Sequence, residues 1–140
     1  MNHRQRIVVK FGTSTLTGGA RQLSHPRMVD LARQIAHVRA LGFEVILVSS
    51  GAIAAGRETL GYPDLPKNMP KKQMLAAVGQ PRLMALYEQF FAIFGVHVAQ
   101  VLLTRADLTD RRRYLNARDT LDALLAQKVR DAIRARAVGA

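Results

Sequence analysis

The stretch RIVVKFGTSTLTGG, residues 6–19, joins an apolar run to a loop of glycines and hydroxyl residues, with Lys10 near the junction. The β-branched run at 6–11 predicts a buried strand that ends where the small residues begin. A second run of the same kind, EVILVSS at 44–50, is followed by Gly51, and a third, HVAQVLLT, spans 97–104. Because these runs are apolar throughout rather than alternating, we expect parallel strands covered on both faces.

Helical patterns separate the three predicted strands. Residues 24–41 carry apolar side chains at spacings of three and four, with Ser24 or His25 as a possible N-terminal cap. A helix-prone segment and a longer amphipathic helix, divided by a proline-broken loop at 62–70, lead to the third strand, and Asp110 can cap a last helix. This order predicts an α/β layered fold with a mainly parallel sheet.

The composition narrows the class of protein. With 140 residues the chain fits one domain or part of a larger one. It has no cysteine, and its four histidines lie far apart, so neither a disulfide framework nor a histidine metal site is predicted. No run approaches the roughly 20 apolar residues that span a bilayer, and no signal-peptide core follows the N-terminus. We therefore expect a cytoplasmic protein without a membrane partner.

The net charge of +11 leaves a nucleic-acid partner open. The basic residues concentrate at 111–113 and in the tail at 128–136, without the interleaved aromatic side chains of a base-stacking surface. We interpret them as solvated helical faces and do not expect nucleic acid as a partner.

The small-residue loops after the first two strands predict a site. Carboxyl ends of parallel strands lie at one edge of a sheet, where free N–H groups at helix starts attract anions and glycine permits close approach. The residues concerned are Lys10, Gly12, Thr13, Ser14, Ser50, Gly51 and Ala52. Their chemistry suits phosphate, although the lysine precedes the glycines, unlike a Walker A loop. The alternative is a surface lysine beside two ordinary turns.

Four longer runs resemble the amino-acid kinase family, in order, from about residue 5 to about 127. They read VVKFGTSTLTGG, VILVSSGAIAAGRETLGYP, KKQMLAAVGQPRLM and VAQVLLTRADLTDRRRYLNARDTLDALL. Within the family they are most similar to the kinases that act on glutamate. The resemblance implies an αβα three-layer sandwich with a mainly parallel sheet, incomplete in this chain. It also implies ATP-dependent phosphorylation of the L-glutamate side-chain carboxylate, the first step of proline synthesis, with proline as feedback inhibitor and a homo-oligomeric parent.

The same resemblance implies roles for the loop residues. Lys10 is the catalytic cation, and Gly12, Thr13 and Ser14 join it in binding the ATP phosphates. Ser50, Gly51 and Ala52 bind glutamate. Mg²⁺ is expected to be held by the nucleotide, with no metal ligand from this chain.

The resemblance stops near residue 129, where the composition changes. We predict a substrate-side part of a kinase domain at 1–129 and a divergent, basic, helical tail at 130–140. Three strands would then leave a sheet edge unpaired, and the chain alone is not expected to turn over ATP. Two other functions stay open: a non-catalytic binding or interaction module, and a nucleic-acid binder suggested by charge alone.

Overall fold

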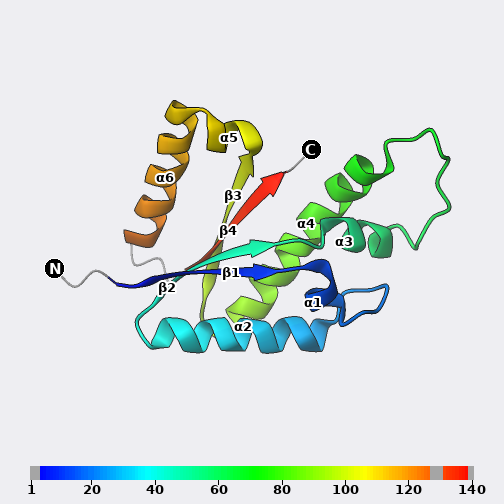
Figure 1. The fold of residues 1–140 in the computed structure, drawn as a ribbon. Helices are drawn as coiled ribbons and strands as arrows, with labels where there is room; N and C mark the ends of the chain where they lie inside the picture. The colour runs from blue at the N-terminus through cyan, green and yellow to red at the C-terminus, as the bar shows by residue number, and fades with distance from the viewer. Residues whose placement is uncertain (1–3, 127–130, 139–140) are drawn as a thin grey trace.

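The computed structural model describes residues 4–126 and 131–138, and it contains one parallel sheet of four strands in the order β1-β2-β4-β3 (Figure 1). The elements in chain order are β1 (Arg6–Phe11), α1 (Thr13–Thr17), α2 (His25–Ala40), β2 (Glu44–Ser49), α3 (Ala52–Thr59), α4 (Lys71–Ala92), β3 (His97–Thr104), α5 (Arg105–Thr109), α6 (Arg111–Ala126) and β4 (Asp131–Val138). Among the described helices, none combines the length and the apolar character needed to cross a bilayer.

The three strands predicted from apolar runs are confirmed. β1 and β3 have the predicted bounds, and β2 ends one residue earlier, at Ser49. β1 and β2 run parallel in a register that places Lys10 beside Val48 and Phe11 beside Ser49. The segments that follow the two strands therefore start side by side at one edge of the sheet.

One face of the sheet carries the hydrophobic core. Phe11, Val45 and Leu47 pack with apolar side chains of α2 and α4, and each buried side chain of this size contributes about 1.5–3 kcal/mol. α2 begins at its predicted cap, where the Arg27 N–H donates to Ser24 Oγ at 3.4 Å. The cap is therefore Ser24 rather than His25.

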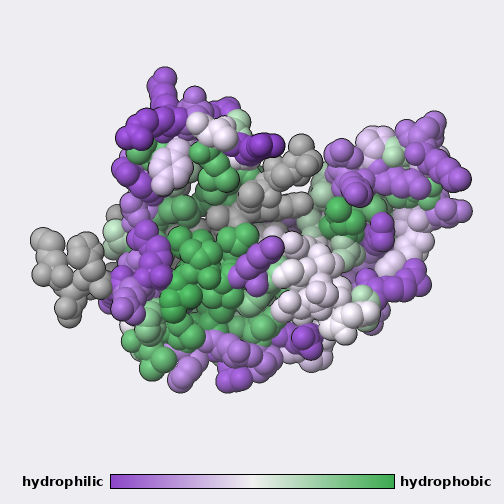
Figure 2. Space-filling model, in the orientation of Figure 1, coloured by the Kyte–Doolittle hydropathy of each residue, from purple (hydrophilic) through white to green (hydrophobic). Residues whose placement is uncertain are grey.

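The other face is less covered than predicted. Burial alternates along β1, and Val8, in the middle of the strand, is 64% exposed. Figure 2 shows apolar side chains gathered over β1 and β2, between α2 and α6. α6 packs against β3 and β4, and its Asp122 reaches the start of β1 through an ion pair with Arg6 at 3.0 Å. The prediction of two covered faces is therefore wrong for β1, where no helix of the described part shields Val8.

The tail differs from its prediction. Residues 131–138 form β4, a parallel strand that pairs with β3 along its whole length and with β2 at Ile46 and Leu47. The predicted helical tail is therefore wrong over this range, while residues 130, 139 and 140 lie outside the described residues. Arg and Ala alternate at 134–137, a period of two that suits a strand, and β2 and β3 both offer backbone groups for pairing. The domain boundary near residue 129 stays a prediction.

α3 and α4 cross at two glycines, Gly56 and Gly79. A Cβ atom built at Gly79 would lie 1.7 Å from the carbonyl oxygen of Ala52, and one at Gly56 would lie 2.0 Å from that of Leu75. Both obstacles are backbone atoms, which cannot rotate away as a side chain can. The two helices therefore approach as closely as only glycine allows.

We expect Gly79→Ala to destabilise the protein. Helix propensity alone would favour alanine by about 1 kcal/mol. The backbone clash acts in the opposite direction, and overpacking typically costs about 1–3 kcal/mol or more. Urea unfolding measures which effect is larger, with Gly12→Ala as the control. Gly12 has φ −77° and no atom within 4 Å of its Cβ position. A stabilised Gly79→Ala variant would contradict the close crossing.

α5 starts with a capping box. The Asp107 N–H donates to Thr104 Oγ1 at 3.3 Å, and Asp107 Oδ2 accepts from the Thr104 N–H at 2.6 Å and its hydroxyl at 2.7 Å. The pKa of Asp107 lies below its ordinary value. The largest cause is the hydrogen bond from the Thr104 side chain, followed by the bond from the Thr104 backbone, and the charge of Arg113 adds to them.

This capping box should therefore fail in acid. A lowered pKa means that ionised Asp107 stabilises the fold above the pKa of the unfolded chain. That stabilisation is lost as the pH falls through the folded pKa. We expect the Thr104 amide resonance to titrate with a midpoint below 3.8, the ordinary value. The transition should be absent in Asp107→Asn, and a midpoint above 3.8 would contradict the assignment.

Candidate functional site

Most of the predicted site residues line one cavity. It has a volume of about 820 Å³ and lies beyond the carboxyl ends of β1 and β2. Five of the seven predicted residues line it: Lys10, Thr13, Ser50, Gly51 and Ala52. Gly12 and Ser14 belong to the same turn as Thr13 but are not among its lining residues. The two loops thus meet as parallel strands require, and we call this space the first cavity.

The segment after β1 is a short helix rather than the open loop that its composition suggested. α1 begins directly after Gly12 and ends at Gly18, which adopts the left-handed conformation with φ 65°. The guanidinium of Arg27 in α2 donates to the carbonyl of Thr15 at 2.8 Å, which fastens α1 to the start of α2. Leu16 is fully buried in the core, so α1 holds Thr13 at the cavity.

Gly51 makes the turn between β2 and α3. Its φ of 110° lies in the left-handed region that other residues rarely adopt, and a Cβ there would lie 2.9 Å from Leu16 Cδ1. Glycine at this position is therefore required by the fold. The turn is fixed to β1 because the Ser50 N–H donates to the Phe11 carbonyl at 2.9 Å.

The start of α3 presents backbone donors to the first cavity. Residues 50–54 line the cavity, and no side chain caps the helix. The first N–H groups of a helix lack partners within it and carry the positive end of the helix dipole. They can therefore bind a carboxylate or a phosphate, as the sequence predicted for Gly51 and Ala52.

A buried hydroxyl pair supports this turn from behind. Ser49 Oγ donates to the Ser50 carbonyl at 2.8 Å, and it also makes a short hydrogen bond with the hydroxyl of Tyr87 in α4. Both Ser49 and Tyr87 are buried, so the bond between their hydroxyls is shielded from water. α4 thus helps to orient the peptide that carries the Ser50 side chain.

Two arginines that were not predicted also line the first cavity. Arg21 comes from the segment before α2, and Arg57 comes from the second turn of α3. Among the described residues that line the cavity, these two and Lys10 are the three cations, and none carries a carboxylate. A sequence signal existed for Arg57, which is the one basic residue in the run AIAAGRETL, directly after the second predicted loop. Arg21 lies in a loop and had no comparable signal.

The first cavity does not fit a metal held by protein ligands. Its lining offers no carboxylate or histidine, whereas Mg²⁺ is usually bound through carboxylates and phosphates. Across residues 4–126 and 131–138, no group of three or more potential ligands gathers. We therefore assign no step to a protein-bound metal.

Residues 5–131 match the profile of the Amino acid kinase family. Over 129 residues, or 92% of this chain, the sequence is 61% identical to "Glutamate 5-kinase" from Photorhabdus laumondii. It is 58% identical to proteins of that name from Klebsiella pneumoniae and Escherichia coli. In each case the match covers 35% of the relative, so the chain spans about a third of the length of these relatives.

Proposed function

The chain belongs to the amino acid kinase family, and from this premise we propose that it is the acceptor-side part of a glutamate 5-kinase. The reaction transfers the γ-phosphoryl group of ATP to the side-chain carboxylate of L-glutamate. One observation carries the proposal beyond family likeness: Lys10, Arg21 and Arg57 line the first cavity, and no carboxylate does so in the described part of the chain. Both the substrate and the transferring group are anions, so this charge suits them.

The proposed acceptor needs no general base. A free glutamate side chain has a pKa of roughly 4.3, so it is already a nucleophilic carboxylate at neutral pH. Catalysis then depends on holding the carboxylate in line with the phosphoryl group. It also depends on neutralising the negative charges of the carboxylate and of the phosphoryl group. Lys10 is exposed at the end of β1 and lines the cavity, which suits the second task.

The proposed division of the site follows the two strands. Lys10, with the Gly12, Thr13 and Ser14 segment after β1, receives the ATP phosphates. Ser50 and the amides of Gly51 and Ala52, after β2, receive glutamate. Mg²⁺ would be held by the nucleotide, since the cavity supplies no carboxylate for it. Proline as feedback inhibitor, a homo-oligomeric parent and a cytoplasmic location belong to the same proposal.

A chimera tests the proposal. The 129 matched residues of the Photorhabdus laumondii relative are replaced by those of this chain, and glutamate-dependent formation of ADP is measured. Activity with glutamate and not with aspartate supports the proposal. A chimera that unfolds cooperatively but forms no glutamate-dependent ADP contradicts it. That result, together with glutamate binding by the same chimera, would favour the non-catalytic binding module.

In the chimera, Lys10→Ala should lower kcat more than it changes KM for glutamate. The charge of Lys10 matters most where negative charge is shared in the transition state. Losing one such contact typically costs on the order of 10²–10³ in rate. Lys72→Ala is the matched control, because Lys72 is exposed and is not among the residues that line the cavity. A Lys10→Ala chimera with normal kcat would refute the catalytic role.

Ser50→Ala should mainly raise KM for glutamate. A hydrogen bond to a charged ligand contributes roughly 1.5–3 kcal/mol, which corresponds to a rise of about 10- to 100-fold. KM for ATP serves as the internal control and should stay within about twofold in steady-state assays. If KM for ATP rose and that for glutamate did not, Ser50 would belong to the nucleotide side.

A further inference from the structure

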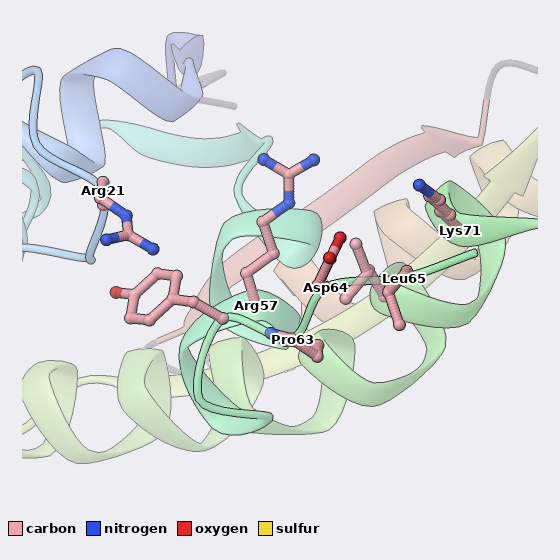
Figure 3. Close-up of a pocket in the computed structure, with 8 residues that line it drawn as sticks. Arg21, Arg57, Pro63, Asp64, Leu65 and Lys71 are labelled. Carbon is pink, nitrogen blue, oxygen red and sulfur yellow. The ribbon is translucent and has the colours of Figure 1, made fainter. Parts of the chain in front are cut away.

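A second cavity of about 300 Å³ adjoins the first. It lies between α3, the loop after α3 and the start of α4. Arg21 and Arg57 line both cavities, whereas Lys71 lines only the second of the two and Lys10 only the first. Figure 3 shows Arg21, Arg57 and Lys71 extending from three separate elements, with Asp64 between Arg57 and Lys71. The two spaces are thus neighbours that share two arginines.

The charge of the second cavity is unbalanced. Its lining has three cations, Arg21, Arg57 and Lys71, against the single carboxylate of Asp64. Within the described part of the chain, none of these cations takes part in an ion pair, and neither does Asp64. Other arginines of the chain do pair, as Arg33 does with Asp30 at 2.9 Å. The arrangement therefore keeps positive charge available to a ligand.

Tyr62 adds a second, independent observation. It is the one described non-glycine residue with positive φ, 57°, a conformation that is an outlier for a bulky residue. Its hydroxyl is buried and has no hydrogen-bond partner among the described protein atoms, which typically costs about 1–3 kcal/mol. Such local costs persist where the surrounding structure enforces them, often at ligand sites.

Tyr62 contacts both residues that the two cavities share. The Tyr62 N–H donates to the Arg57 carbonyl at 2.7 Å, which ties the loop to the last turn of α3. Its ring lies under Arg21, with the guanidinium carbon 4.1 Å from the ring centroid. Tyr62 thus orients the Arg21 side chain and fixes the backbone at Arg57, and neither arginine has an ion-pair partner among the described residues.

We propose that the second cavity binds a small oxyanion, a phosphate or a carboxylate, and that its occupancy weakens anion binding in the first cavity. The guanidinium groups of Arg21 and Arg57 neutralise an anion on either side, but an anion on one side reduces the charge felt on the other. Linkage makes this antagonism reciprocal, so a ligand in the first cavity weakens the second by the same factor. The inference concerns binding alone and does not depend on the kinase activity.

The test is NMR titration of the 140-residue chain with inorganic phosphate at constant ionic strength. The Gly51 amide reports on the first cavity and the Gly61 amide, next to Tyr62, on the second. We expect both resonances to move and saturate, with different dissociation constants. A parallel titration with glutarate distinguishes a carboxylate from a phosphate ligand. The anion with the lower dissociation constant at Gly61 is the preferred ligand of the second cavity. If Gly61 saturates with neither anion, the proposal is overturned.

Two variants then assign the second site. Lys71→Met should raise the dissociation constant for phosphate measured at Gly61 about tenfold, as expected for the loss of one charged contact. The dissociation constant measured at Gly51 should change by no more than about twofold. Lys10→Met should do the reverse. Lys72→Met, the control on the same turn of α4, should change neither. Equal effects of Lys71→Met and Lys72→Met would mean that only net charge matters, which overturns the proposal.

Asp64→Asn gives a variant with little risk to folding, because Asp64 is exposed in a loop. Removing the one carboxylate of the lining should tighten phosphate binding at Gly61. Saturating the tightened site should then shift the Gly51 titration to higher phosphate concentration. Weaker binding in Asp64→Asn, or independent titration of Gly51 and Gly61, would overturn the antagonism between the cavities. An inactive chimera would leave these outcomes unaffected.

Discussion

The close crossing of α3 and α4 at Gly56 and Gly79 determines where both cavities can form. Backbone atoms of one helix occupy the space that a side chain on the other would need. The crossing sets the position of α3, and hence of the turn at Gly51 that begins it. It also sets the gap between the end of α3 and the start of α4, which the loop at 62–70 must span. The first cavity depends on the turn and the second on the loop.

The core contributes through the same helix. α4 buries Leu83, Leu86 and Phe91 against the sheet, and Tyr87 extends this contact to the hydroxyl of Ser49. Burial of α4 therefore does more than stabilise the fold. It fixes the peptide at Ser50 from the buried side while the opposite side stays open to the cavity. A rigid scaffold behind an accessible turn is what positioning of a substrate carboxylate requires.

The local pattern predicted the strands and the helix caps well, because apolar runs and capping residues act over a few positions. Ser24 and the bounds of β1 and β3 are examples. β4 could not be predicted in this way, since its place depends on β2 and β3, and at least 26 residues of the chain separate it from either strand. Arg21 was missed for a related reason: it comes from a separate loop and contacts the ring of Tyr62, and no local pattern indicates that contact. The features that the sequence did not predict are therefore those that depend on contacts between segments far apart in the chain.

Gly12 and Gly51 both belong to the predicted site, but the structure explains the need for glycine only at position 51. Gly51 has a positive φ and a crowded Cβ position, so the fold alone requires it. Gly12 has a φ of −77° and no atom within 4 Å of its Cβ position, so the described structure would admit a side chain there. Packing among the described residues therefore does not explain glycine at position 12. Close approach of a phosphate to the backbone is an advantage of glycine there, because the absence of a side chain leaves the amides accessible. The contrast supports the proposed role of Gly12 in phosphate approach, whereas the turn that Gly51 makes is enough to explain glycine at position 51.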